Sequence, residues 1–161
     1  MIACFDIGAT FTRYGLSDKS GRVRELGRAQ TQTADFEAFV STVRTGLEIT
    51  KAPAGAPVSI SLCGTVDPVG GKVTVANVPS INGKALAHKL TERLQRQVTV
   101  TNDADCFAMA EARFGAGTGH RNVFAIILGT GVGGGPQCRS PDTRRGARRF
   151  FASRKLHWCD D

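Results

Sequence analysis

Apolar and polar positions at the start of the chain predict three short strands. The apolar run Ile2–Ile7 ends at a turn residue, Gly8, and a run of this length before a glycine is typical of a buried strand. Residues 12–16 and 22–30 predict two more strands, because the polar cluster Asp18-Lys19-Ser20-Gly21 between them is typical of a turn. We therefore expect an antiparallel meander of three strands.

Beyond residue 33 the apolar spacing alternates between the period of a helix and that of a strand. The first helix is predicted from Phe36, Phe39, Val40, Val43 and Leu47, and either Thr33 or Asp35 is a suitable cap for its start. The elements expected after it are a strand at 58–62, a hairpin at 66–75 with positive φ angles at Gly70-Gly71, a helix with Leu86, Leu90 and Leu94 on one face, a strand at 97–101, a helix over 104–114 and an apolar strand at 122–128.

This order of elements predicts an α/β domain of the ribonuclease-H-like kind. Its mixed sheet would have three antiparallel strands, extended by parallel strands through crossover helices. The 161 residues are 41% hydrophobic, which suits one domain with a sizeable core. We place this domain at residues 1–135. Residues 136–161 have no apolar period and are expected to form a disordered basic tail.

The formal net charge of +7 is unevenly distributed. Residues 1–135 hold 14 basic and 11 acidic groups, a net of +3, and residues 136–161 hold 7 and 3, a net of +4. Nucleic-acid binding through residues 139–155 is therefore one possible function of the tail, although a solvated tail is the favoured interpretation.

The cysteines and the apolar runs indicate a soluble, cytoplasmic protein with no membrane partner. Five cysteines at positions 4, 63, 106, 138 and 159 are an odd number without a CxxC pair, which argues against a disulfide framework and a zinc site. No apolar segment reaches the roughly 20 residues that span a bilayer.

The first candidate site is the segment Asp6-Ile7-Gly8-Ala9-Thr10-Phe11-Thr12-Arg13. A glycine-containing hairpin with two threonines offers amide and hydroxyl donors to a phosphate, and the carboxylate of Asp6 would suit a metal ion bound through water. The alternative is an ordinary hairpin whose turn Asp6 caps.

Two further candidates follow later strands. The glycine run 129–135 contains Thr130 and would let the backbone approach a phosphate closely, although a flexible linker is the alternative. In Asn102-Asp103, the carboxylate of Asp103 would accept a proton from a substrate hydroxyl. The alternative is that Asp103 only caps the following helix.

Taken together, five segments resemble the successive motifs of the ROK family (repressors, open reading frames and sugar kinases), within the actin-like ATPase and hexokinase superfamily. They occur in order over residues 2–135. The segments are 6–13, Cys63-Gly64-Thr65-Val66-Asp67, 77–83, 102–111 and 128–135.

The resemblance implies a role for each matching position in the ATP- and magnesium-dependent phosphorylation of a sugar such as glucose or an N-acetylhexosamine. Asp103 would be the catalytic base for a sugar hydroxyl, usually the 6-hydroxyl, and Asn102 would hydrogen-bond the sugar. Gly64, Asn82 and Gly83 would line the sugar site. The nucleotide phosphates would contact Gly8, Thr10, Thr12, Gly129, Thr130 and Gly131, with Asp6 near the magnesium.

The chain departs from the family pattern in two ways. Ala9 and Phe11 stand where the family often has Gly and Lys. The family also continues for a further domain's length, with a Glu-x-Gly-His segment and a zinc motif that Cys138, His157 and Cys159 do not reproduce. We therefore expect a truncated lobe that is inactive alone, with an out-of-frame translation product at 136–161.

Two alternatives to an enzyme remain within this resemblance. A non-catalytic sugar sensor of the family is one. A repressor is disfavoured, because the first strand begins at Ile2 and leaves no room for a preceding DNA-binding domain. The sequence indicates neither the sugar nor the oligomeric state.

Overall fold

The computed structural model describes residues 1–128 and 132–138, and the chain divides into two compact units. The first unit comprises Met1–Asp103 and the second Ala104–Asp161. We describe each unit by itself. The predicted tail begins at residue 136, and its first three positions belong to a strand in place of the expected disordered segment. The rest of the predicted tail lies outside the described residues.

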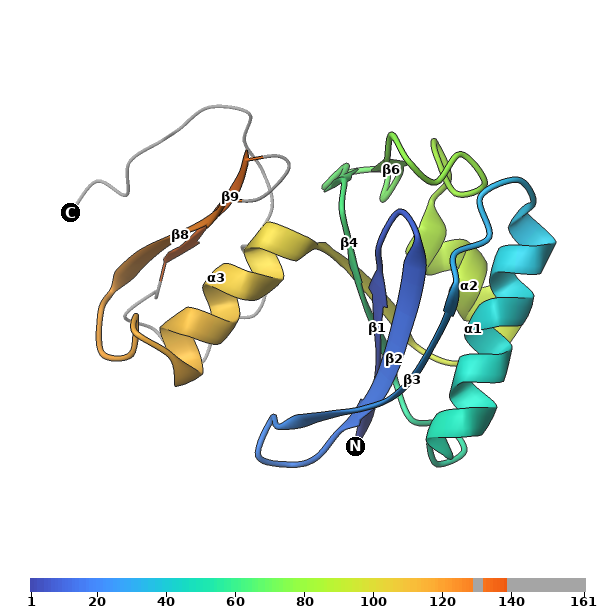
Figure 1. Ribbon diagram of the computed structural model, residues 1–161, viewed down its shortest axis with the longest axis horizontal. Helices are drawn as coiled ribbons and strands as arrows, with labels where there is room; N and C mark the ends of the chain where they lie inside the picture. Colours follow the sequence, from blue (N-terminus) through green and yellow to red (C-terminus); the bar gives the residue numbers. More distant parts are fainter. Residues whose placement is uncertain (129–131, 139–161) are drawn as a thin grey trace. The chain divides into compact units, whose positions relative to one another are not determined.

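The first unit is built on a five-stranded mixed sheet in the order β3-β2-β1-β4-β7 (Figure 1). Its antiparallel part is a meander, and its parallel part joins β1 to β4 and β4 to β7. This arrangement confirms the predicted fold class. The strands are β1 Ile2–Ile7, β2 Phe11–Ser17, β3 Val23–Gln30, β4 Val58–Leu62 and β7 Val98–Asn102.

Two helices, α1 (Phe36–Thr50) and α2 (Leu86–Leu94), provide the crossovers and lie on the same face of the sheet (Figure 1). Helix α1 begins after Asp35, whose carboxylate accepts a hydrogen bond from the Ala38 amide at 3.0 Å. Of the two predicted caps, Asp35 is therefore the one used. Within the described ranges, no helix combines the length and apolar character needed to cross a bilayer.

The core lies between the helices and one face of the sheet, because strand residues alternate between the two faces. On β1 the side chains of Ala3, Phe5 and Ile7 are buried, whereas Asp6 on the other face is exposed. The strands β4 and β7 follow the same alternation, and α1 and α2 complete the cluster. Its other members include Val58, Ile60, Leu62, Val98, Val100, Phe39, Val40, Val43, Leu47, Leu86 and Leu90.

Glycine permits the close approach of α1 to the sheet at one position. A Cβ atom added to Gly46 would lie 2.6 Å from Cε1 of Phe5 and 3.2 Å from Cδ1 of Tyr14. Both rings are buried and tilted against each other with centroids 6.2 Å apart. The aromatic pair therefore occupies the space that a side chain on the helix would need.

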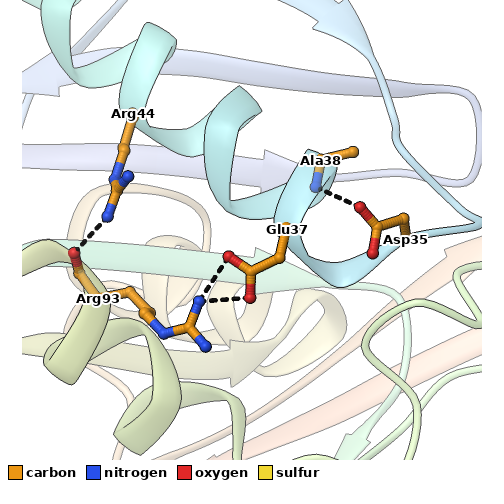
Figure 2. A network of polar contacts seen from close by, with 5 residues as sticks. All are labelled: Asp35, Glu37, Ala38, Arg44 and Arg93. Carbon is orange, nitrogen blue, oxygen red and sulfur yellow. Dashed lines mark hydrogen bonds and ion pairs between the residues drawn. The ribbon is translucent and has the colours of Figure 1, made fainter.

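Polar contacts also join α1 to α2 (Figure 2). The guanidinium of Arg93 donates to the carboxylate of Glu37, and Nη2 of Arg44 donates to the Arg93 carbonyl at 2.9 Å. The Arg93 and Glu37 side chains are 46% and 60% exposed, and an ion pair so exposed contributes about 0–1 kcal/mol. These polar contacts therefore contribute little, and the packing of the two helices depends mainly on the buried apolar cluster.

The predicted hairpin at 66–75 is present as strands β5 (Thr65–Val66) and β6 (Val73–Thr74). One detail of the prediction is wrong. Of the two turn glycines, only Gly71 has a positive φ angle, 65°. The turn is tightened instead by the carboxylate of Asp67, which accepts a hydrogen bond from the Gly70 amide at 2.8 Å.

The second unit contains α3 (Asp103–Phe114), which begins at the last residue of the first unit, and the antiparallel pair β8 (Asn122–Leu128) and β9 (Val132–Cys138). The strand at 122–128 was expected to extend the parallel sheet, and this is wrong because it pairs with β9. The glycine run was not expected to form a strand. A Cβ atom on Gly135 would lie 2.6 Å from the Ala104 carbonyl oxygen, so this strand needs glycine to approach α3.

We predict that Gly46→Ala destabilises the protein, although alanine is the better helix former by about 1 kcal/mol. The added methyl group meets the Phe5 ring, and overpacking of this kind costs about 1–3 kcal/mol. Urea unfolding followed by circular dichroism measures the change. The neighbouring exposed position provides the control, since Thr45→Ala should leave the midpoint unchanged or raise it. A raised midpoint for Gly46→Ala would contradict the packing argument.

Candidate functional site

The parallel strands of the first unit end side by side. In the register of the sheet, Ile7 is the partner of Leu62, and Leu62 is the partner of Asn102. The residues that follow these ends are Gly8, Cys63 and Asp103. They consequently lie at one edge of the sheet, the carboxyl edge, where open α/β sheets bind their ligands.

The first candidate segment forms a tight turn between β1 and β2. The amide of Gly8 donates to the Phe11 carbonyl at 3.0 Å. Thr31, which directly follows β3, fixes this turn through two hydrogen bonds. Its hydroxyl donates to the Gly8 carbonyl at 2.8 Å, and its amide donates to the Thr10 carbonyl at 2.9 Å. No periodic pattern in the sequence indicates Thr31, so this supporting residue of the turn was not predicted.

Thr12 is placed differently from the other residues of this segment. Its side chain is fully buried, and its hydroxyl oxygen lies 3.1 Å from that of Thr31. The side chain of Thr10 is exposed. In this structure Thr12 therefore supports the turn from inside, while Thr10 is presented at its surface.

The carboxylate of Asp6 is exposed at the end of β1, on the face of the sheet opposite to the core. Its cross-strand partners are Arg13 on β2 and Ser61 on β4. Among the described residues, no three His, Cys, Asp or Glu side chains form a metal-binding group. A single carboxylate nevertheless fits magnesium, because that ion often binds one or two carboxylates together with waters and substrate phosphates.

Cys63 and Asp103 meet at the centre of this edge. Partial desolvation raises the pKa of the Cys63 thiol, and the charge of Asp103, a hydrogen bond to its carboxylate and the charge of Asp6 raise that pKa further. A negative charge close to a thiol disfavours the thiolate, which is the direction of each of these effects. The thiol is therefore held in its protonated form, from which it donates to Asp103.

The turn after β4 is fixed to β7 by the side chain of Asn102. Its Nδ2 atom donates to the Gly64 carbonyl at 2.6 Å. A Cβ atom on Gly64 would lie 2.4 Å from Cγ1 of Val75 and 2.5 Å from the Thr74 carbonyl oxygen. Close packing therefore requires glycine at position 64, and the hydrogen bond from the Asn102 side chain fixes the position of the turn.

Asn82 and Gly83 lie in the connection between β6 and α2. The side-chain oxygen of Asn82 accepts a hydrogen bond from the Val75 amide at 3.1 Å. Gly83 has a φ of 71°, and its amide donates to the Val73 carbonyl at 2.8 Å. Both residues therefore shape this connection, which packs against the Gly64 turn.

The glycine run and the cap of α3 are the predicted features that remain to be located. Gly129, Thr130 and Gly131 lie outside the described residues. Helix α3 begins at Asp103, so the N-cap position falls on Asn102 and not on Asp103. The structure thus brings Asp6, Gly8, Thr10, Gly64, Asn102 and Asp103 to one edge, and Asn82 and Gly83 to the connection beside it.

Comparison with known proteins decides the family, because the ROK family profile matches residues 2–138. The chain belongs to the ROK family. An N-acetylgalactosamine kinase of Shewanella sp. strain ANA-3 is 37% identical to it over 132 residues, and an N-acetyl-D-glucosamine kinase of Citrobacter koseri is 38% identical over 133 residues. These matches cover 81% of the chain but only 42% and 44% of the two relatives.

Solved structures of sugar kinases also match this chain over part of their length. An inorganic polyphosphate/ATP-glucomannokinase from Arthrobacter sp. strain KM matches with a TM-score of 0.71 and 35% identity, over 83% of this chain and 56% of the other. A ROK family glucokinase from Streptomyces griseus, solved with glucose and AMPPNP, matches with a TM-score of 0.70 and 33% identity, over 84% and 43%. The chain spans about half the length of these proteins or less.

We predict that Asp103→Asn speeds the alkylation of Cys63. The variant removes both the charge and the carboxylate hydrogen bond that raise the pKa of the thiol, so the thiolate fraction at a fixed pH near 8 increases. Iodoacetamide labelling with peptide mapping measures the rate at each cysteine. Cys4 is the internal control, because burial raises the pKa of its thiol without any contribution from Asp103. An unchanged rate at Cys63 would show that the two side chains do not interact.

Proposed function

We propose that this chain is the N-terminal lobe of an ATP-dependent sugar kinase that phosphorylates a hexose or an N-acetylhexosamine. One observation supports this function above the others. The carboxylate of Asp103 stands at the carboxyl edge of three parallel strands, next to the Cys63-Gly64 turn, in a chain of the ROK family. Relatives at 37–38% identity carry the names of N-acetylhexosamine kinases.

In this proposal Asp103 accepts the proton of a sugar hydroxyl, usually the 6-hydroxyl, as that oxygen attacks the terminal phosphate. Asn102 and Gly64 contact the sugar in this proposal. The hydrogen bond of 2.6 Å from the Asn102 side chain to the Gly64 carbonyl would keep the turn after β4 at a constant distance from Asp103. Asn82 and Gly83 belong to the same sugar site through the β6–α2 connection that they shape.

The phosphate side of the proposed site is the turn after β1. Asp6 would hold magnesium, through water, and Gly8 and Thr10 would contact phosphate, with Thr12 in a supporting role because its hydroxyl is buried. When bound, magnesium neutralises the charge of the phosphates. Gly129, Thr130 and Gly131 are proposed as the second phosphate loop on the strength of the family motif.

The chain spans 42–44% of the curated relatives it matches, and we propose that the complete catalytic cleft includes parts beyond the matched region. The sequence places the end of the lobe at residue 135, but strand β9 and the family match both continue to Cys138. We propose that residues 1–138 belong to the lobe and that residues 139–161 do not. The contacts that exclude water from the reacting groups would then come from a second lobe.

A chimera tests the proposed role of Asp103. Residues 1–138 replace the corresponding part of the Shewanella N-acetylgalactosamine kinase, and ADP release is measured with N-acetylgalactosamine, N-acetylglucosamine and glucose. We expect sugar-dependent turnover that Asp103→Asn reduces by about 10²–10⁴-fold, the usual contribution of a general base. Asp18→Asn, the same change in the exposed β2–β3 turn, is the control and should retain activity. Full activity of the Asp103 variant would refute the proposal.

The 161-residue chain alone should release ADP no faster with sugar than without it. The reason is that a lobe with one side of the cleft can bind a sugar but cannot exclude water from the phosphate. The same coupled assay with the three sugars measures this rate. Turnover by the isolated chain that Asp103→Asn abolishes would show instead that the lobe is sufficient.

A further inference from the structure

Two arginines lie side by side on the face of the sheet opposite to the core. Arg13 on β2 is the cross-strand partner of Asp6, and Arg28 on β3 is the partner of Arg13. Directly opposed residues of an antiparallel pair share one face of the sheet. Asp6 is exposed on the face away from the core, so both arginines lie on that face as well, and both are exposed.

An aromatic ring places the guanidinium of Arg28 beside the β1–β2 turn. The Cζ atom of Arg28 lies 4.7 Å from the centroid of the Phe11 ring, within the range of a cation–π contact. Phe11 is the first residue of β2, and its carbonyl accepts the hydrogen bond from Gly8 that closes the turn. A positive charge is therefore held next to Phe11, the residue that stands where the family often has a lysine.

The two arginines form a pair of opposed like charges. Within the part of the chain that the structure describes, neither guanidinium is within ion-pair or hydrogen-bond distance of another side chain, the carboxylate of Asp6 included. Like charges directly opposite each other on neighbouring strands destabilise a sheet. An anion that contacts both guanidinium groups would remove this repulsion, so the pair favours a negatively charged ligand.

The spacing of the pair suits a chain of linked phosphates. Opposed residues of an antiparallel pair have Cβ atoms about 4.5–5.5 Å apart, and a guanidinium donates two parallel hydrogen bonds to phosphate oxygens. Arg13 and Arg28 can consequently contact successive phosphates of one chain. The β1–β2 turn beside them has only neutral donors, the amides and the hydroxyl of Thr10, which do not offset the charge of a polyanion.

The order of the strands gives the direction of that chain. Strand β1 is the middle strand, with β2 and β3 on one side and β4 and β7 on the other. Adjacent strands are about 4.8 Å apart, so Asp103 follows a strand roughly 10 Å from β1, and Arg28 lies on a strand at the same distance on the opposite side. A phosphate next to a sugar hydroxyl at Asp103 would have its linked phosphates extending past the turn toward the arginines.

We propose that Arg13 and Arg28 bind the phosphates of the donor that are not transferred. This assignment rests on the function proposed above. When the sugar oxygen attacks and its proton passes to Asp103, the bond from the transferred phosphorus to the bridging oxygen breaks. The electron pair of that bond stays on the bridging oxygen, so negative charge increases on the phosphates that leave. The two guanidinium groups therefore stabilise the leaving group as well as bind the donor.

Calorimetric titration of the 161-residue chain with magnesium present tests the assignment. The ligands are ATP and inorganic tripolyphosphate, which has the phosphate chain without the nucleoside. We expect Arg13→Met and Arg28→Met each to weaken the binding of both ligands at least about tenfold, the loss of one charge-assisted hydrogen bond. Arg28→Lys should recover part of the affinity, because lysine keeps the charge but lacks the planar fork.

Arg24→Met is the matched control for these variants. It removes the same charge from an exposed position of β3, four residues away from Arg28. Four strand residues span about 13 Å, beyond the Debye length of about 8 Å at physiological salt, so this change should leave both affinities within about twofold. The basic residues of 139–161 are the same in every variant, and anion binding to them contributes equally to each.

The stability of the variants separates binding from a structural role. Arg13→Met removes one of two opposed like charges, so the midpoint of its urea unfolding should be unchanged or higher. Weaker binding together with a lowered midpoint would assign the pair a structural role and overturn the proposal.

The other outcomes distinguish this inference from the proposed function. Losses no greater than that of Arg24→Met would overturn it, and so would a loss confined to ATP, because the pair would then contact the nucleoside. If the chimera described above phosphorylates a sugar while binding is independent of Arg13 and Arg28, the kinase proposal stands and this one fails. If the chimera is inactive but tripolyphosphate binding depends on both arginines, the phosphate site holds and the kinase function fails.

Discussion

The parallel register of β1, β4 and β7 is the constraint on which the candidate site depends. Because Ile7, Leu62 and Asn102 are aligned across the three strands, the turns that follow them begin at the same level. A shift of one residue in any strand would turn its apolar side chains out of the core. The buried alternation that stabilises the lobe therefore also determines that Gly8, Cys63 and Asp103 come together.

The carboxyl edge of the sheet carries two carboxylates, Asp6 and Asp103, and their charge affects phosphate binding. Asp6 and Asp103 both act on the Cys63 thiol and raise its pKa, so two carboxylates share a small region. A nucleotide phosphate would be repelled by them unless a cation lay between. In the proposed function, a divalent ion near Asp6 would remove this repulsion and would leave Asp103 to face the sugar.

Most of the first unit could be predicted from the sequence, because its strands and helices have side-chain periods that report burial. The second unit shows where this reasoning ends. Strand β9 contains three successive glycines, Gly133–Gly135, which have no side chains to form a period, so an extended pairing segment resembles a loop. Its partner β8 was consequently assigned to the wrong sheet.

The candidate site was predictable in its positions but not in its supporting contacts. The inward direction of Thr12 follows from its pairing with Ile7, a register that no local pattern specifies. Thr31 is 19 residues away from Thr12 along the chain and meets it only in the folded sheet. The clamp from Asn102 to Gly64 likewise joins residues 38 positions apart.

In the proposed function, Cys63 would orient the carboxylate of Asp103 and still leave it able to accept a proton. Since its thiol is kept protonated by its surroundings, it donates a hydrogen bond to the Asp103 carboxylate, and a thiol is a weak donor. A lysine or arginine at this position would form a charge-assisted bond about twice as strong as a neutral one and would compete with a substrate proton for the same oxygen atoms. A weak donor orients the carboxylate and is readily displaced from it.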